Sequence, residues 1–282
     1  MRLGEALRRA ELVLQEHAVE APRLNAEVLL MHALGCGRTM LLAHPERALS
    51  AGEQTQFLAM VERCAAGEPR QYVTGIQEFW GLEFAVTPAV LIPRPETEHL
   101  VEAALALVKQ GRLPANLKLI DVGTGSGAIA LSLAHELPQA EVTATDISTA
   151  ALAVARRNAE RLGVDGRVRF VESDVLAALP GEGRFDLIVS NPPYVALSEA
   201  DKVQAIVKDY EPLGAVFAGE DGLSVIERLI PQAAIALRPG GWLMIEIGYS
   251  MAEAVTSLLG KWHEAGVIPD LAGIPRVVVA RR

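Results

Sequence analysis

The stretch "LIDVGTGSGAIAL", Leu119 to Leu131, joins two apolar runs through a turn that holds Gly123, Gly125 and Gly127. The first run is short and apolar, as in a buried strand, and the second is typical of a helix. Glycines in the turn let the backbone bend tightly and let a ligand approach it closely. Free N–H groups at the start of the helix would face that ligand. The stretch therefore predicts a strand, a ligand-binding turn and a helix.

This pattern of strand and helix continues to the end of the chain. Near-continuous apolar runs alternate with helical ones, which is typical of a parallel sheet covered by helices on both faces. The predicted strands include "EVTATDI", "RVRFVES", "FDLIVSN", "GWLMIEIG" and "RVVVARR". Two long helices are expected among the last of them, in "GLSVIERLIPQAAIAL" and in "MAEAVTSLLGKWHEAG". The fold class is thus α/β with a doubly wound, mostly parallel sheet.

The chain before residue 96 lacks this alternation of strand and helix patterns. Residues 1–70 contain only helical patterns, and apolar side chains recur there on one face of a 3.6-residue repeat. Ser50 is a candidate helix cap. Residues 71–95 are rich in Pro, Gly and aromatics and predict a β-hairpin linker, with short β-like runs "FWGLEFAV" and "AVLI". We expect three parts: a helical bundle (1–70), the linker (71–95) and the α/β domain (96–282). In the first predicted helix of residues 1–70, the apolar side chains that recur on one face are Leu3, Leu7, Ala10, Val13 and Leu14.

Charge and composition narrow the function classes. The 26 Lys and Arg against 35 Asp and Glu give a net charge of −9, which disfavours broad binding to nucleic acid. No run approaches the ~18 apolar residues of a membrane span, and the start of the chain lacks a signal-peptide core. Two cysteines without a pairing motif, Cys36 and Cys64, fit a reduced cytoplasmic setting. The six histidines lack the spacing of a metal site.

An acidic residue strengthens the glycine-rich turn as a cofactor site. Asp146 ends the second strand of the α/β domain, where a carboxylate commonly holds a ribose diol. The turn is not the G-x-G-x-x-G of an NAD site, and Asp121 beside it suits a cationic amino-acid group, as in S-adenosylmethionine. Asp174, after the third strand, could accept from an adenine amino group. The alternatives are a turn that only packs and aspartates that only cap helices.

The second candidate site is "NPPY", Asn191 to Tyr194, at the end of the fourth strand of this domain. Its position predicts the same sheet edge as the glycine turn. Proline fixes the backbone and lacks an N–H, so the segment predicts a rigid rim of acceptors. The Asn191 side-chain oxygen and the Pro192 carbonyl could accept the two hydrogens of a planar NH₂ group, and Tyr194 could stack on it. The alternative is a turn that only ends the strand.

The motifs "DVGTGSGAIAL", "TDIS", "FDLIVSNPPY" and "LRPGGWLMIEIG" resemble the class I S-adenosylmethionine-dependent methyltransferases that act on amino nitrogens. The segments "EFWGLEFAVTPAVLIPRPETEHLV", "DYEPLGAVFAGEDGL" and "DLAGIPRVVVARR" are similar to the peptide-chain release factor glutamine methyltransferases. The resemblance implies a seven-stranded Rossmann-like sheet. It also implies methylation of the glutamine amide in the Gly-Gly-Gln motif of class 1 release factors, with residues 1–70 in substrate recognition.

The resemblance also implies roles for single residues. Arg94 would lie near the mouth of the active site and help to bind the substrate. Val175 stands where some relatives have tryptophan, and Met251 where glutamine is common. The implied catalytic residues are Asn191, Pro192 and Tyr194; the implied substrate-binding residues are Asn191, Pro192, Pro193, Tyr194 and Arg94. The implied cofactor-binding residues are Gly123, Thr124, Gly125, Ser126, Gly127, Asp146, Asp174, Val175 and Asn191.

Three other functions share parts of this pattern. A ribosomal-protein glutamine methyltransferase has the same rim, but the segment after the hairpin there resembles "PRSPI" more than "PRPETE". An adenine amino-methyltransferase is a second alternative because its substrate, adenine, also presents an NH₂ to such a rim, but the net charge of −9 stands against it. A non-catalytic S-adenosylmethionine-binding module would need neither Asn191 nor Tyr194. The release-factor function is therefore favoured, with no metal and no direct nucleic-acid contact expected.

Overall fold

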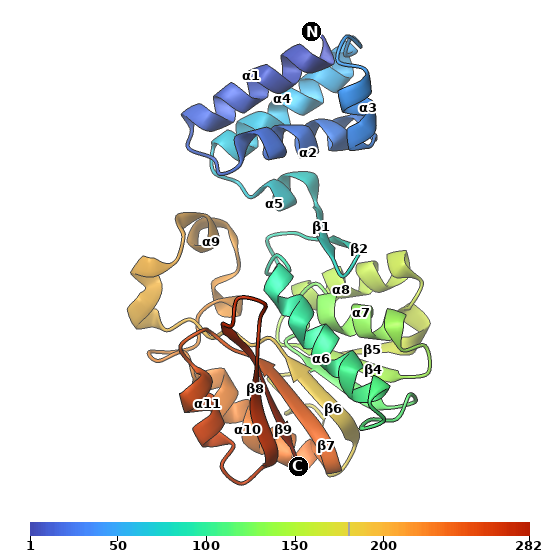
Figure 1. The fold of residues 1–282 in the computed structure, drawn as a ribbon, viewed down its shortest axis with the longest axis vertical. Coiled ribbons are helices and arrows are strands. Elements are labelled where there is room, and N and C mark those ends of the chain that lie inside the picture. Colours follow the sequence, from blue (N-terminus) through green and yellow to red (C-terminus); the bar gives the residue numbers. More distant parts are fainter. Residues whose placement is uncertain (180) are drawn as a thin grey trace. The chain divides into compact units, whose positions relative to one another are not determined.

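The structure is a computed structural model that describes residues 1–179 and 181–282, and it contains two compact units. Met1–Ile76 form the first unit and Gln77–Arg282 the second. Helices alone make up almost all of the first unit, whereas the second holds a twisted sheet with helices on its faces (Figure 1). The fold class predicted from the sequence, an α/β domain with a small helical bundle, is confirmed.

The first unit is a bundle built on buried leucines. Leu3, Leu7 and Leu14 lie on the buried face of its first helix, as the 3.6-residue repeat predicts. Ser50 caps the fourth helix: its hydroxyl accepts from the Glu53 N–H, and the Glu53 carboxylate accepts from the Ser50 N–H. The helices are α1 (Leu3–Glu16), α2 (Pro22–Leu34), α3 (Arg38–Ala43), α4 (Ala51–Ala65) and α5 (Arg70–Thr74).

A short hairpin follows. β1 (Ile76–Phe79) and β2 (Leu82–Ala85) form a two-stranded sheet, joined by Trp80 and Gly81. Both turn residues have positive φ, 55° and 67°, which is the geometry of the tight turn that matches the twist of two strands. The run "AVLI" at 89–92 is not a strand, contrary to the sequence prediction. The segment is irregular, and its apolar side chains Val90 and Ile92 are nevertheless buried.

The second unit is organised around a seven-stranded sheet in the order β5-β4-β3-β6-β7-β9-β8. Strands β5, β4, β3, β6 and β7 are parallel, and β9 runs antiparallel to both of its neighbours. After β3 the chain builds β4 and β5 on one side and then crosses to β6 on the other. Ligands bind at such a switch point, beyond the carboxyl ends of the strands. The strands are β3 (Lys118–Val122), β4 (Glu141–Asp146), β5 (Val168–Glu172), β6 (Phe185–Ser190), β7 (Leu237–Glu246), β8 (His263–Pro269) and β9 (Pro275–Arg281).

Two separate cores cover the two faces of this sheet. In β6, Leu187 and Val189 face a cluster with α6 and α7, whereas Ile188 between them faces a cluster with α10 and α11. The alternation follows from the two-residue period of a strand. Figure 1 shows these helix pairs on opposite sides of the strands. The helices are α6 (Glu98–Lys109), α7 (Ala128–Glu136), α8 (Thr149–Leu162), α9 (Ala205–Tyr210), α10 (Ser224–Ala236) and α11 (Ala252–Leu258), with 3₁₀ turns at Pro95–Thr97, Asp165–Arg167, Leu197–Lys202 and Leu213–Ala215.

One predicted helix is wrong in its second half. The sequence indicates a helix through residues 251–266, but α11 ends at Leu258 and the edge strand β8 begins at His263. The side chains of β8 are exposed or partly exposed along its whole length, so it shows no clear apolar alternation. The segment becomes a strand because it pairs with β9. Its own sequence pattern does not predict this strand.

Candidate functional site

The glycine-rich turn lies between β3 and α7, as predicted. Gly123, Gly125 and Gly127 all have positive φ, 75°, 56° and 87°. A Cβ atom at Gly123 or Gly125 would meet no protein atom within 4 Å, so the backbone there is open. At Gly127 a Cβ would lie 2.8 Å from a methyl carbon of Leu131, so this glycine serves packing of the helix start. The turn thus combines two open positions with one closed position.

Asp146 holds this turn from the end of β4. One carboxylate oxygen accepts from the Gly125 N–H and the other from the Ser148 N–H, each at 2.9 Å. Ser148 itself caps α8 by accepting from the Ala151 N–H, so Asp146 is not the helix cap. Burial raises the pKa of Asp146, and the backbone hydrogen bonds oppose that rise. Each oxygen retains a lone pair, which suits a pair of hydroxyl donors.

Asp121 lies deeper than the sequence suggests. Its carboxyl is fully buried and accepts from the Thr124 hydroxyl at 2.7 Å and from the Ala130 N–H at 3.2 Å. Its second oxygen, Oδ1, has no hydrogen-bond partner in the part of the chain that the structure describes. Burial raises the pKa of Asp121 to about 7. Asp121 therefore supports the turn from below and is not among the residues that line the pocket described next.

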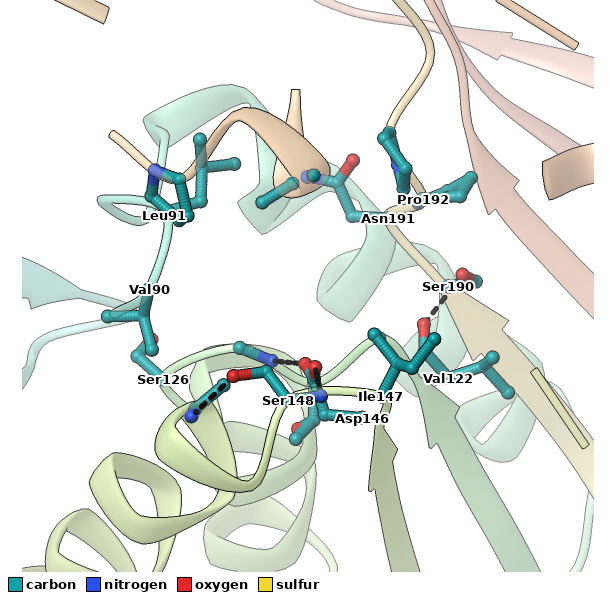
Figure 2. Close-up of a pocket in the computed structure, with 18 of the residues that line it drawn as sticks. Val90, Leu91, Val122, Ser126, Asp146, Ile147, Ser148, Ser190, Asn191 and Pro192 are labelled. Atoms are coloured by element: carbon teal, nitrogen blue, oxygen red, sulfur yellow. Dashed lines mark hydrogen bonds between the residues drawn. The ribbon is translucent and has the colours of Figure 1, made fainter. Parts of the chain in front are cut away.

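A pocket of about 420 Å³ lies above the carboxyl ends of β3, β4 and β6. This volume is within the range of ~300–1,000 Å³ that is usual for small-molecule sites. Figure 2 shows Asp146 and Ser148 on one wall, Asn191 and Pro192 on a second, and Val90 and Leu91 on a third. Of the residues predicted for the site, the pocket brings together Arg94, Gly123, Thr124, Gly125, Ser126, Asp146, Asp174, Val175, Asn191, Pro192 and Pro193.

Asp174 and Val175 line the pocket beyond β5. Asp174 forms a bidentate ion pair with Arg228, with Nη1–oxygen distances of 2.9 and 2.7 Å. No helix follows Asp174 through residue 179, so the alternative of a helix cap does not apply. Val175 has a φ of 52°, which is unusual for a β-branched residue. Strained backbone of this kind is concentrated at ligand sites.

The Asn-Pro-Pro rim forms the wall beyond β6. The Asn191 side-chain nitrogen donates to the Thr97 hydroxyl at 3.0 Å, and its side-chain oxygen accepts no hydrogen bond from the residues that the structure describes. Pro192 and Pro193 also line the pocket. Tyr194 does not line it: a ring carbon lies 3.3 Å from the position of a Cβ on Gly248. Burial is the main reason that the pKa of Tyr194 rises to about 12.

Arg94 lies on the pocket wall in an ion pair that the sequence did not reveal. Its Nη2 lies 2.5 Å from Oε1 of Glu211, and the other carboxylate oxygen accepts from the Ile92 N–H at 3.1 Å. Glu211 is 5 % exposed. It ties the segment before α6 to the segment after α9.

Several further residues of the site carry no local signal. Asn158 on α8 is fully buried and donates to the Ser126 carbonyl at 2.9 Å, so it holds the glycine turn in place. Thr97 and Arg228 also contact predicted site residues. Thr97 lies inside the segment "PRPETE" and Glu211 inside "DYEPLG". In the sequence, only these family-like segments indicate that the two residues belong to the site.

The pocket fits S-adenosylmethionine by the chemistry of its wall. The open backbone at Gly123 and Gly125 admits a close ligand, and Asp146 offers acceptors for a diol. Among residues 1–179 and 181–282, no group of His, Cys, Asp and Glu could hold a metal ion. Within the same residues, no helix combines the length and the apolar character that a membrane crossing requires.

Comparison with known families covers both units. The family described as "PrmC N-terminal domain" matches residues 5–75, and the family described as "Methyltransferase small domain" matches residues 98–210.

Curated relatives match over the whole chain. The release factor glutamine methyltransferase of Koribacter versatilis is 51% identical over 100% of this chain and 99% of its own length. That of Moorella thermoacetica is 47% identical over 99% of this chain and 97% of its own. Among solved structures, the 16S rRNA N2 G1207 methyltransferase of T. thermophilus, in complex with AdoMet and guanosine, has a TM-score of 0.53 at 24% identity. It covers 73% of this chain and 49% of its own length, and at that identity it supports the fold alone.

Proposed function

Because this chain belongs to the family of release factor glutamine methyltransferases, we propose that its pocket transfers a methyl group to a glutamine amide of a peptide-chain release factor. The chain is an S-adenosylmethionine-dependent methyltransferase. We propose that the specific methyl acceptor is the glutamine of the Gly-Gly-Gln motif in class 1 release factors. The observation that carries the proposal is the Asn191 oxygen, a free acceptor in the same pocket as the glycine turn and Asp146.

The cofactor half of the pocket is the wall around the glycine turn. Asp146 would accept from the ribose hydroxyls, and Asp174 and Val175 would lie beside adenine. Backbone at Gly123 and Gly125 is open for a close approach. When bound, S-adenosylmethionine supplies a methyl carbon on a positively charged sulfur, which is an electrophile. The remaining cofactor-binding residues in the proposal are Thr124, Ser126 and Asn191, whereas Gly127 supports the turn by packing and does not line the pocket.

The substrate half is the Asn-Pro-Pro rim. A carboxamide nitrogen is a weak nucleophile, because its lone pair is delocalised into the carbonyl. The Asn191 oxygen and the Pro192 carbonyl would accept its two hydrogens, which raises the electron density on nitrogen and orients it. The glutamine nitrogen would gain the methyl carbon as the bond between that carbon and the cofactor sulfur breaks, which leaves a neutral thioether, and it would lose one proton to water. Proline at 192 and 193 keeps the acceptors fixed, since its φ does not vary.

Supporting roles follow for three other parts of the chain. Arg94, held by Glu211, would contact the release factor at the pocket wall. Tyr194 would complete the amide site once substrate is present. The helical unit Met1–Ile76 carries no cofactor motif and would bind the body of the release factor. The site of action would be the cytoplasm, where release factors work.

The alternative substrates have less support. The curated relatives named above are release factor enzymes, which disfavours a ribosomal-protein substrate. An adenine substrate would require nucleic-acid binding, and the net charge of −9 opposes it. We therefore infer no direct nucleic-acid partner.

The test is mass spectrometry of purified release factor after incubation with this protein and S-adenosylmethionine. We expect the release factor to gain the mass of one methyl group, and fragmentation to place it on the glutamine of Gly-Gly-Gln. Purified ribosomal proteins and an adenine-containing duplex serve as competing substrates. Methylation of either competitor with an unmodified release factor would contradict the proposal.

A further inference from the structure

Glu246 is a buried carboxyl group that the functions above do not use. It is the last residue of β7 and is 3 % exposed. Among residues 1–179 and 181–282, its oxygen Oε2 has no hydrogen-bond partner. Leaving a buried acceptor unpaired costs stability, so packing does not explain a glutamate at this position.

The sheet places Glu246 next to Asn191. Strands β6 and β7 are parallel, and Ser190 pairs with Ile245. Asn191 and Glu246 are the residues that follow this pair. The Thr97 and Asn191 side chains lie close enough to the Glu246 carboxyl group to lower its pKa. The Asn191 nitrogen also donates to the Thr97 hydroxyl at 3.0 Å.

The charge on Glu246 decides which neighbouring groups can donate hydrogen bonds to it. An ionised carboxylate only accepts hydrogen bonds, so it selects the NH₂ end of the Asn191 amide and the O–H of Thr97. The Thr97 oxygen is then free to accept from Asn191. With its nitrogen bound to Thr97, the Asn191 amide keeps its oxygen available to accept from a substrate in the pocket that both residues line. A neutral group at 246 could donate instead, and the amide could then turn its NH₂ toward the substrate.

We propose that Glu246 is a positioning residue that, together with Thr97, keeps the Asn191 side-chain oxygen directed at the glutamine amide. This inference rests on the proposed function, because the amide is the group that Asn191 would receive. A donor in place of that oxygen would face the NH₂ of the substrate, donor against donor. Glu246 does not touch the pocket itself, since it is absent from the residues that line it.

The ionisation of Glu246 depends on its surroundings. Burial raises its pKa to about 7, and the nearby Thr97 hydroxyl and Asn191 amide lower it. The charged and titratable groups around it are Arg276 on β9, Glu96 beside Thr97, and Tyr194 after the rim. Arg276 lowers the pKa, but its Nε is bound to Asp270 at 2.9 Å. Methyl transfer should therefore increase as the pH rises through about 7, where Glu246 becomes ionised.

The first experiment compares steady-state kinetics of Glu246→Gln with wild type on a release factor. We expect kcat to fall by roughly tenfold to a hundredfold, with an unchanged dissociation constant for S-adenosylmethionine. The rise of the rate through neutral pH should be absent. Glu253→Gln, an exposed glutamate on α11, is the matched control and should behave as wild type. A Glu246→Gln enzyme with wild-type kcat would overturn the inference and leave the proposed function standing.

A second pair of variants covers the case in which Glu246→Gln does not fold. Thr97→Ser keeps the hydroxyl and should retain activity, whereas Thr97→Val keeps the shape and should lose as much as Glu246→Gln. Because the residues act on one amide, Thr97→Val with Glu246→Gln should be no worse than either single variant. Equal activity of the Ser and Val variants would overturn the inference.

A readout without substrate separates this inference from the proposed function. In ¹⁵N-labelled full-length protein, the side-chain NH₂ signals of Asn191 are identified by their loss in Asn191→Ala. We expect them to shift with pH around neutrality in wild type and to stay constant in Glu246→Gln. A pH-independent wild-type signal would overturn the positioning role, whichever substrate the enzyme methylates.

Discussion

Arg94 and Glu211 form an ion pair with 2.5 Å between Nη2 and Oε1, although 117 positions separate them in the chain. The carboxylate is almost fully buried, whereas the guanidinium is about one-third exposed. The pair therefore holds the wall of the pocket together and leaves part of Arg94 available to a substrate.

Removing Arg94 should destabilise the protein because the buried carboxylate of Glu211 then loses its positively charged partner. We expect Arg94→Met to lower the free energy of unfolding by roughly 1–3 kcal/mol in urea denaturation. Adding Glu211→Gln should restore part of the loss, since a neutral side chain is less costly to bury. Lys202→Met, which breaks an exposed pair with Glu199, should cost roughly 0–1 kcal/mol. Equal losses for the Arg94 and Lys202 variants would refute this account.

Asn191→Ala should abolish methyl transfer and leave the affinity for the cofactor largely intact. The variant removes the acceptor for the substrate amide, but the turn and Asp146 remain. Radiolabelled methyl transfer to release factor measures the first effect, and calorimetric titration with S-adenosylmethionine measures the second. Asn116→Ala changes an exposed asparagine before β3 and should leave both unchanged. If Asn191→Ala weakened cofactor binding as much as catalysis, the division of the pocket into two halves would be wrong.

Asp146→Asn should weaken S-adenosylmethionine binding by about tenfold, or ~1.4 kcal/mol. Its new NH₂ would face either the Gly125 N–H or the Ser148 N–H, so one backbone hydrogen bond is lost with the charge. Calorimetric titration gives the affinity. Asp165→Asn, an exposed aspartate after α8, is the matched control. An unchanged affinity in Asp146→Asn would exclude Asp146 from the cofactor site.

Asp121 should make the stability of the protein depend on pH. Its pKa is about 7 in the folded protein against 3.8 as the ordinary value, because the carboxyl is buried. Between these two values the unfolded chain loses the proton and the folded chain keeps it. This group therefore stabilises the fold fully at low pH, and its contribution falls by up to about 1.4 kcal/mol per pH unit as pH rises toward about 7.

The variant Asp121→Asn isolates that effect. Its oxygen can still accept from Thr124 and Ala130, and it carries no titrating proton. We expect the difference in unfolding free energy between wild type and variant to change across this pH window, as followed by urea denaturation at several pH values. A constant difference would show that Asp121 does not titrate there.

Much of the fold could be predicted because it depends on neighbours in the chain. The strand, turn and helix of Leu119–Leu131 appear as expected, and so does the cap at Ser50. The family resemblance is also confirmed, by relatives that match along the full length. The edge strand β8 was missed, since its exposed side chains carry no alternation and its partner β9 forms it.

The amino-acid order alone was enough to place the glycine turn, Asp146 and the Asn-Pro-Pro rim at the ends of their strands. Those placements follow from apolar period, turn chemistry and the restricted backbone of proline, all of which act over a few residues. The partners that hold the rim and the wall, Thr97, Glu246 and Glu211, emerged only from the folded chain. Crossover connections bring residues from distant segments to one sheet edge, and no local pattern records which of them will meet there.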